Sequence, residues 1–338
     1  MLQEHRIEVK MANLLIQSLG CPNCGAPYNP KTRNCRFCGS VLIVTSLAET
    51  FTHNLDAHQV SVSLDKWRKL LKVDTENAKA HYALGLTYLN SKLRDAALTH
   101  LRKAVLLAPE VADTHYNLAI TLMDDGNKSI NSPEYAEAVK EIDYSNRLAP
   151  DFREAQAFRH FILARKLDEV DNQQALAEYI KAAKTCSDIA MLQNNLGFCL
   201  FKSNNLADAE VCFRRAITLN PNDYGAYTNL CVLMYRKGMY KEGIEAGMKA
   251  VANSGAGKNA NAYDILALCL WKSKRKLEAL EYIKKAIAIE PDNPRYKENL
   301  KKIQESSPLK STFNTTVWII IIIAIIYFFI QWLWWVNH

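Results

Sequence analysis

The stretch that decides the fold runs from His81 to Pro109 and reads HYALGLTYLNSKLRDAALTHLRKAVLLAP. Two later stretches repeat its pattern: Gln193–Pro221 reads QNNLGFCLFKSNNLADAEVCFRRAITLNP, and Tyr263–Pro291 reads YDILALCLWKSKRKLEALEYIKKAIAIEP. In each stretch, apolar residues recur at i, i+3, i+4 and i+7 on both sides of a short polar turn. The pattern therefore predicts a pair of amphipathic helices that is repeated along the chain. Because proline cannot continue a helix, the closing proline marks the end of each unit.

Small residues recur where the two helices of a unit must approach each other closely. They are Gly85 and Ala97, Gly197 and Ala209, and Ala267 and Ala279. A larger side chain at these positions would hold the two helices apart, because protein interiors leave little unfilled space.

The repeated unit resembles the tetratricopeptide repeat (TPR), which has a Leu-Gly pair, an aromatic residue or Leu, an Ala-x3-aromatic block, a further Ala and a closing Pro. In the first stretch these places are held by Leu84-Gly85, Tyr88, Ala97, Leu101, Ala104 and Pro109. In the second they are held by Leu196-Gly197, Leu200, Ala209, Phe213, Ala216 and Pro221. The resemblance implies an all-α fold, a TPR-type α-solenoid of about six helix pairs. Such pairs stack into a right-handed superhelix with a concave groove, because no single pair can bury its own apolar face.

Six repeats fit the sequence, at residues 78–111, 112–152, 153–189, 190–223, 224–259 and 260–293. A partial helix, LDKWRKLLKVD, precedes them, and a capping helix, PRYKENLKKIQE, follows. The second repeat carries about seven extra residues in its turn. The third has Arg159-His160 in place of the Leu-Gly pair and ends in Ser187 instead of proline.

The resemblance implies that the groove holds a peptide or helix of a partner protein. The predicted partner-binding residues are Asn117, Asn195 and Asn229, at the sixth position of their repeats, together with Tyr82 and Tyr227. Asparagine amides can hydrogen-bond an extended peptide backbone. The alternative interpretation is that asparagine is simply common at this place in the repeat.

The cationic clamp of repeats that bind chaperone tails is absent from the sequence. The first repeat has Tyr82 and Leu86 at the clamp positions, the third has Glu154 and Phe158, and only Asn117 matches. Binding of chaperone tails is therefore disfavoured.

Four cysteines near the N-terminus form two C-x2-C pairs in the stretch CPNCGAPYNPKTRNCRFCG, which runs from Cys21 to Gly39. The four thiolates come from Cys21, Cys24, Cys35 and Cys38. Four thiolates make a closed tetrahedral site, which predicts one structural Zn²⁺ ion. The stretch is similar to a short zinc ribbon, and about twenty residues cannot build a core, so the metal must hold it folded.

The ribbon has three interpretations. The main one is a structural zinc site in an interaction module. Basic residues between the pairs, Lys31, Arg33 and Arg36, motivate contact with nucleic acid or the ribosome. Redox or metal sensing is the third, because a thiolate site can release zinc when it is oxidised. The other five cysteines are single, so buried thiols and a reducing compartment are expected.

The C-terminal stretch Val317–Val336 reads VWIIIIIAIIYFFIQWLWWV. It is an apolar run of twenty residues that only Gln331 interrupts. As a helix it spans roughly 30 Å, the thickness of a bilayer's hydrocarbon core. Tryptophans near both ends match the two interfacial aromatic belts. The stretch predicts a membrane helix.

Lysines precede this stretch, at 297, 301, 302 and 310. Their position predicts a tail-anchored, single-pass protein with the bulk of its chain in the cytoplasm. A bacterial inner membrane is favoured, and the endoplasmic reticulum is the alternative.

The predicted organisation has six parts. They are an N-terminal extension (1–18), the zinc ribbon (19–46), a linker (47–55), the TPR superhelix with capping helices (56–306), a juxtamembrane linker (307–316) and the transmembrane helix (317–336).

The predicted function is that of a membrane-anchored, cytosol-facing scaffold or adaptor that binds partner proteins through the groove. A net charge of +7 over 338 residues is modest and disfavours a dedicated nucleic-acid binder. The motif GAGKNA (Gly255–Ala260) lacks the Ser or Thr and the first glycine of a phosphate-binding loop, so no enzyme activity is predicted. The alternatives are a ribosome- or nucleic-acid-associated membrane factor that acts through the ribbon, and a redox-responsive regulator.

Overall fold

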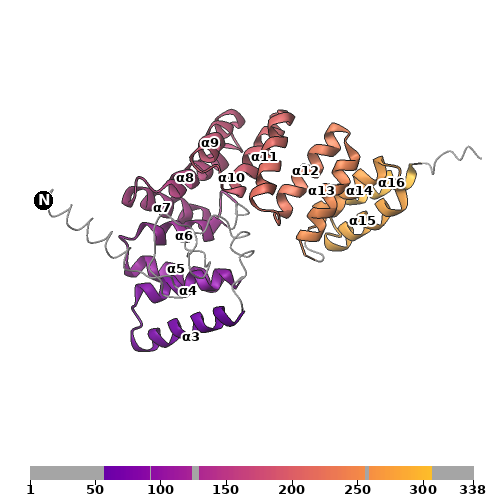
Figure 1. Cartoon of the computed structure of the whole chain (residues 1–338). Coiled ribbons are helices and arrows are strands. Elements are labelled where there is room, and N and C mark those ends of the chain that lie inside the picture. Colours follow the sequence, from indigo (N-terminus) through magenta and orange to yellow (C-terminus); the bar gives the residue numbers. More distant parts are fainter. Residues whose placement is uncertain (1–56, 92, 124–128, 256–258, 307–338) are drawn as a thin grey trace, which may run out of the picture. The chain divides into compact units, whose positions relative to one another are not determined.

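The computed structural model describes residues 57–91, 93–123, 129–255 and 259–306. Within these ranges the regular structure is helical, and fourteen helices follow one another (Figure 1). Their bounds are α3 (Ala57–Val73), α4 (Ala78–Asn90), α5 (Arg94–Leu107), α6 (Ala112–Met123), α7 (Pro133–Leu148), α8 (Arg153–Leu167), α9 (Asn172–Thr185), α10 (Ala190–Lys202), α11 (Leu206–Leu219), α12 (Tyr224–Lys237), α13 (Tyr240–Asn253), α14 (Ala260–Lys272), α15 (Lys276–Ile289) and α16 (Pro294–Glu305). Fourteen helices amount to about seven pairs, against the six predicted, because α3 precedes and α16 follows the six repeats.

The first helix of every repeat begins where the sequence pattern predicts it. The helices α4, α6, α8, α10, α12 and α14 start at residues 78, 112, 153, 190, 224 and 260. Pro109, Pro221 and Pro291 each lie two residues past the end of a helix. This agreement arises because the apolar period and the closing proline are both local signals.

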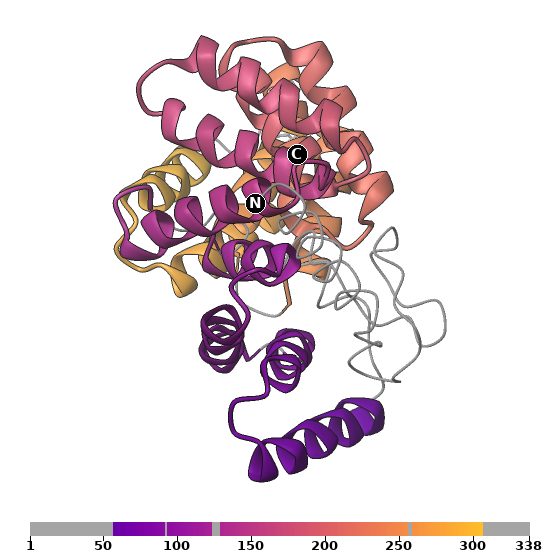
Figure 2. The same cartoon turned by 90° about the vertical axis from the view of Figure 1, so that its left-hand side faces the viewer.

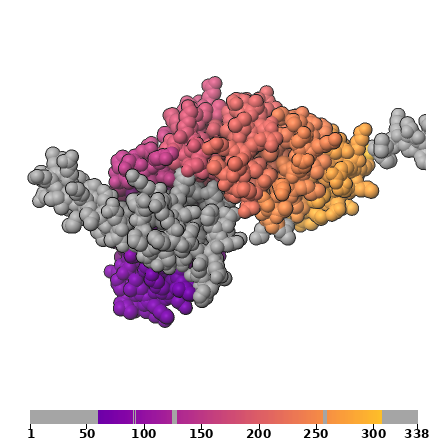
Figure 3. Space-filling model, viewed as in Figure 1, coloured from indigo at the N-terminus to yellow at the C-terminus, as the bar shows by residue number. Residues whose placement is uncertain are grey.

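The chain divides within α12 into two compact units, the first ending at Leu233 and the second starting at Met234. In the first unit, α3 packs on α4, and the pairs α4–α5, α6–α7, α8–α9 and α10–α11 follow. Figure 2 shows the two helices of the first repeat side by side and nearly end-on. In the second unit, α14 packs on both α13 and α15, and α16 packs on α15. The residues of this unit are coloured orange to yellow in the space-filling view of Figure 3.

Close approach of the two helices in a repeat depends on a small residue at the eighth position. A Cβ atom on Gly85 would lie 2.7 Å from Cγ of Leu101, and one on Gly197 would lie 2.8 Å from Cδ1 of Phe213. Real Cβ atoms do not come so close to other carbons, so both glycines are required by packing. The prediction that small residues allow this approach is confirmed. In the sixth repeat the same two positions hold Ala267 and Ile283, which are both fully buried.

The third repeat achieves its packing without the glycine. His160 stands at the eighth position of α8, and its Nδ1 lies 2.6 Å from Oε2 of Glu178 on α9. Lys181 donates to the other carboxylate oxygen of Glu178 at 2.6 Å. Burial would raise the pKa of Glu178, but the bonds from Lys181 and His160 outweigh it and lower that pKa. A polar contact therefore joins α8 to α9 where the first and fourth repeats have a glycine.

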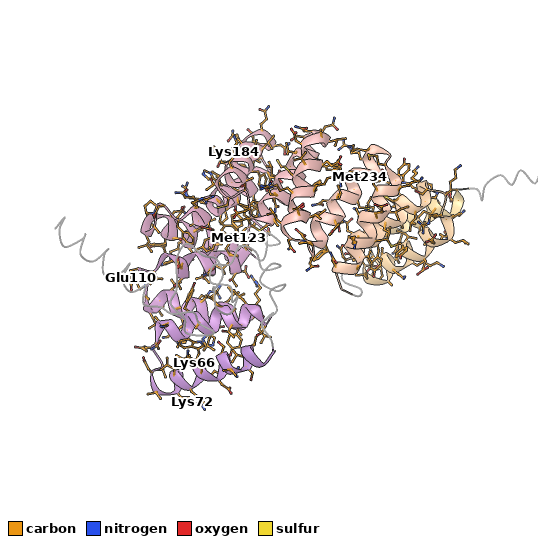
Figure 4. The ribbon with its side chains drawn as sticks, in the orientation of Figure 1. Lys66, Lys72, Glu110, Met123, Lys184 and Met234 are labelled. Carbon is orange, nitrogen blue, oxygen red and sulfur yellow. The ribbon has the colours of Figure 1, made fainter. Side chains whose placement is uncertain are left out.

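The second repeat accommodates its longer turn between two well-defined helix ends. The helix α6 ends at Met123, which is fully buried (Figure 4). Pro133 opens α7, and the side chain of Ser132 accepts a hydrogen bond from the backbone N–H of Tyr135. Serine at the cap and proline in the first turn are both favoured at a helix start.

The turns inside the last three repeats close through a residue with positive φ at the fifteenth position. Asn204 has φ of 62°, Gly238 of 76° and Lys274 of 65°. Glycine and asparagine are commonly found in this left-handed region, whereas a lysine there is uncommon. The tight turn thus places Lys274 in a backbone conformation that a lysine does not favour.

We expect the substitution Gly197→Ala to lower the free energy of unfolding of the full chain by about 1–2 kcal/mol. The added methyl group clashes with Phe213, which costs more than the roughly 1 kcal/mol gained in helix propensity. Urea unfolding followed by far-UV circular dichroism measures the change.

The matched control combines Gly197→Ala with Phe213→Ile, which reproduces the Ala–Ile combination of the sixth repeat. The alanine should cost less beside isoleucine than beside phenylalanine, so the two substitutions should be non-additive by at least about 0.5 kcal/mol. Additive effects would show that the close approach at this position does not limit packing.

Candidate partner-binding surface

Two of the predicted partner-binding residues contact each other across the first two repeats. Nδ2 of Asn117, on α6, donates a hydrogen bond of 2.6 Å to the hydroxyl of Tyr82, on α4. Asn117 is fully buried. Burial raises the pKa of Tyr82 well above 10, so the phenol is neutral at physiological pH. The amide of Asn117 therefore joins two neighbouring repeats.

The same link recurs at two further junctions. Nδ2 of Asn229 donates to Oδ1 of Asn194 at 2.9 Å, and Nδ2 of Asn299 donates to Oδ1 of Asp264 at 2.7 Å. In all three pairs the partners are 35 residues apart, so the sixth position of one unit bonds the fifth position of the unit before it. Asn194, Asp264 and Asn299 were not among the residues predicted from sequence. A comparison of the fifth position of each unit with the sixth position of the next unit would have identified these three residues.

The two remaining junctions of the first unit fill these positions differently. Between the second and third repeats they hold Tyr116 and Phe158, whose rings meet edge to face with centroids 6.2 Å apart. Between the third and fourth repeats they hold Ala157, which is fully buried, and Asn195. Alanine offers no polar atom, so Nδ2 of Asn195 donates instead to the carbonyl of Met191 in its own helix, at 2.8 Å.

Asn195 therefore differs from the other two predicted asparagines. It is half-buried, and its amide takes no part in a bond between repeats among the described residues. Phe198 lies three residues further along α10, on the neighbouring turn, and is 44% exposed. The two side chains place an amide and an aromatic ring close together on the surface of α10.

Tyr227 does not share a face with Asn229. The two residues are separated by two positions on α12, and side chains two apart on a helix point in nearly opposite directions. Both are half-buried. The five predicted residues thus do not form one continuous ladder, and their binding to a partner stays a prediction.

A pocket of about 170 Å³ lies beside Tyr82, at the junction of the first and second repeats. Its lining is mainly aliphatic, and Lys79 and Glu110 are its charged members. The residues that line it are Ala78, Lys79, Tyr82, Ala104, Ala108, Glu110, Val111 and Thr114. Its size and apolar lining suit a single apolar side chain of a partner.

Two predicted sites lie outside the described residues. They are the zinc ligands Cys21, Cys24, Cys35 and Cys38 and the membrane helix at 317–336. In the part of the chain that the structure describes, no three His, Cys, Asp or Glu side chains converge as metal ligands, and no helix is long and apolar enough to span a bilayer.

The five single cysteines are buried thiols, as the sequence predicts. They are Cys186, Cys199, Cys212, Cys231 and Cys269. Burial raises the pKa of Cys199 and of Cys212 to about 11, so both thiols are protonated at neutral pH. A protonated, buried thiol is a packing residue and a poor nucleophile.

Stacked antiparallel helix pairs with small residues at the points of close approach define a helical repeat protein of the kind that binds other proteins. Family models of the tetratricopeptide repeat match residues 78–111, 190–223 and 260–293. These ranges coincide with the first, fourth and sixth repeats read from the sequence. The chain is a tetratricopeptide repeat protein.

Similar proteins come from both eukaryotes and bacteria. The chain is 25% identical over 203 residues to the BBSome complex member BBS4 homolog of Drosophila melanogaster, covering 60% of this chain and 39% of that protein. It is 25% identical over 170 residues to the type IV pilus assembly protein PilF of Pseudomonas aeruginosa, covering 49% of this chain and 62% of that protein. The chain thus spans less than two thirds of each of these curated relatives.

Solved structures share the fold at lower identity. The crystal structure of the APC/C hetero-tetramer Cut9–Hcn1 superposes with a TM-score of 0.59 at 19% identity, over 77% of this chain and 51% of that one. The structure of Pseudomonas aeruginosa PilF gives a TM-score of 0.51 at 19% identity, over 67% of this chain and 97% of that one. At such identities the likeness supports the fold alone.

We expect Asn229→Ala to destabilise the chain by about 1 kcal/mol more than Asn195→Ala, because only the first removes a hydrogen bond between two repeats. Both substitutions change the same residue type at the same repeat position, so differences in helix propensity cancel. Urea unfolding of the two variants measures the difference. Equal stabilities would mean that the bond between Asn229 and Asn194 contributes nothing to repeat stacking.

We expect the effect of Asn299→Ala to depend on pH. Burial raises the pKa of Asp264 above its usual value, while the hydrogen bond from Asn299 and the positive charge of Arg295 oppose that rise. Removing the amide raises this pKa further. A carboxyl group with a raised pKa in the folded state binds its proton more tightly there than in the unfolded chain, so stability falls as the pH rises through that pKa.

The destabilisation by Asn299→Ala should therefore be about 1–2 kcal/mol larger at about pH 7 than at about pH 4. Urea unfolding at both pH values measures it. Combining the substitution with Asp264→Asn removes the titrating group and should abolish the dependence on pH. A pH-independent effect of Asn299→Ala alone would contradict the role of the amide in holding Asp264 ionised.

Proposed function

We propose that this protein is a membrane-anchored, cytosol-facing adaptor that binds a partner protein through Asn195 and Phe198 on α10. One observation carries the proposal. Of the three asparagines predicted at the sixth position, Asn195 is the one whose amide joins no two repeats among the described residues, and it stays half-exposed beside an exposed aromatic ring.

The chemistry of this pair suits an extended peptide. An asparagine amide offers both a donor and an acceptor, which match the two polar groups of a peptide unit. Phe198 offers apolar area that becomes buried only when a partner covers it, and aromatic side chains contribute strongly to protein interfaces. Together they favour a segment with a free backbone edge and an adjacent apolar side chain.

The names of the similar proteins agree with a role in assembly. Two curated relatives are named as a member of the BBSome complex and as a pilus assembly protein. We propose the same kind of role for this chain, with a partner that differs from theirs.

The proposal includes the two ends of the chain. The apolar segment Val317–Val336 would anchor the protein in a membrane, with the repeats in the cytoplasm. The four N-terminal cysteines would hold one structural zinc ion in a ribbon that makes a second protein contact. The membrane would be a bacterial inner membrane or the endoplasmic reticulum.

Photo-crosslinking in cells tests the adaptor function. A photoreactive amino acid at position 195 or 198 should capture one discrete protein, and the same amino acid at position 211 should not. Val211 is a matched control because it is apolar and 66% exposed but lies on α11, the second helix of the same repeat. We expect Asn195→Ala to reduce the yield at position 198 about fivefold or more, since a hydrogen bond at an interface contributes about 1 kcal/mol.

Capture at position 211 but not at 195 or 198 would contradict the proposed surface. A photoreactive amino acid at position 33 tests the alternative of a ribosome- or nucleic-acid-associated factor. Capture of RNA or a ribosomal protein at position 33, with no capture at position 195, would show that the ribbon binds the partner. If the protein is a redox-responsive regulator, mild oxidant should release zinc from the full chain and leave its helical content unchanged.

A further inference from the structure

The turns at one edge of the second unit carry only basic charges. Residues 236–240 read RKGMY and residues 272–276 read KSKRK. Because successive helices run in opposite directions, these two turns share an edge, and the turn at 290–293 lies at the opposite one. That turn reads EPDN, so both of its charged residues are acidic. The other turn at that edge, residues 254–259, reads SGAGKN and carries Lys258, so the contrast in charge is between the two basic turns and the turn at 290–293.

The last described residues of the chain are held against the basic turn. The indole N–H of Trp271 donates to the hydroxyl of Ser306 at 2.9 Å. The ammonium group of Lys276 donates to the carbonyl of Gln304 at 2.8 Å and to the carbonyl of Ser306. The segment that follows Ser306 in sequence leads to the predicted membrane anchor, so the fold fixes the point from which that segment departs.

Two lysines of the turn are available for an external anion. Lys272 and Lys274 form no ion pair within the described ranges, whereas Arg275 is paired with Glu278 at 2.6 Å. The ammonium group of Lys272 lies 4.3 Å from the ring centre of Trp271. Leu277, the residue after the KSKRK turn, is 84% exposed, which is unusual for a large apolar side chain.

We propose that Lys272, Lys274 and Leu277, here called the basic edge, contact an anionic lipid bilayer, the one in which the C-terminal segment is anchored. This inference rests on the proposed membrane anchoring. Ammonium groups with a tryptophan beside one of them and an exposed leucine a few residues further along the chain suit an interface where phosphate headgroups meet acyl chains. Each lysine near an anionic membrane surface strengthens surface association about fivefold.

The spacing to the anchor permits this contact. Ten residues, 307–316, separate Ser306 from Val317, and ten residues extend over at most about 35 Å. A tether of this length holds the basic edge at a high effective concentration beside the bilayer, so weak contacts suffice. Only the fold brings the turn at 272–277 next to Ser306, since the two are about thirty residues apart in sequence.

The conformation of Lys274 provides independent support. It has a φ of 65°, while the equivalent turns carry Gly238 and Asn204, which tolerate this region better. An uncommon residue in a left-handed turn is a hypothesis of function in its own right. Lys274→Gly should therefore make the fold more stable while it weakens the membrane contact, which separates binding from folding.

Hydrogen–deuterium exchange of the full chain in lipid nanodiscs tests the inference. Discs of phosphatidylcholine alone are compared with discs that contain about 30% phosphatidylglycerol. Amides at 272–277 should exchange about fivefold more slowly in the anionic discs, and amides at 290–293 should not change. The double variant Lys272→Gln/Lys274→Gly should lose the difference. The control Lys297→Glu, which changes the net charge by the same amount but on α16, should keep it.

The outcomes distinguish the two proposals. If the chain does not enter nanodiscs and alkaline carbonate extracts it from membranes, the proposed anchoring fails, and this inference fails with it. If the chain enters the discs but 272–277 exchanges equally in both lipids, only the inference is overturned. If added RNA slows exchange at 272–277 and anionic lipid does not, the basic edge binds nucleic acid, and the lipid assignment is again overturned.

Discussion

The two helices of a repeat can share a core only if their backbones come close at one point, and that constraint shapes the rest of the structure. Gly85 and Gly197 leave room for Leu101 and Phe213, and a single methyl group would close the space. The third repeat has no small residue at this position, and a bond between His160 and Glu178 joins its two helices there. Once the pair is closed, one apolar face of it stays uncovered, so further repeats must stack on it.

The way the repeats are joined decides which side chains are left for a partner. Where the fifth position of one unit offers a polar atom, as in Tyr82, Asn194 and Asp264, the asparagine at the sixth position of the next unit bonds to it. Where it offers only Ala157, the amide of Asn195 stays at the surface. The alanine inside the stack thus leaves at the surface an amide of the kind that joins the units at three other junctions.

Sequence periodicity was enough to predict the helices, because the apolar spacing, the small residues and the closing prolines are local signals. It also predicted the asparagines, but not their separate roles. Whether Asn117 or Asn195 faces a partner depends on the residue at a different position one repeat earlier, which no pattern within a repeat contains. The link between Asn299 and Asp264 was missed for the same reason, since it joins the sixth repeat to a capping helix that carries little of the repeat pattern.

The bonds from Trp271 and Lys276 to the end of α16 have a mechanical consequence. A pull on the chain beyond Ser306 acts first on hydrogen bonds that reach α14 and α15, and not on α16 alone. Tension is thereby spread over three helices, so the capping helix does not peel away one turn at a time. A protein that holds a partner under load at a surface would need such a fixed point of attachment.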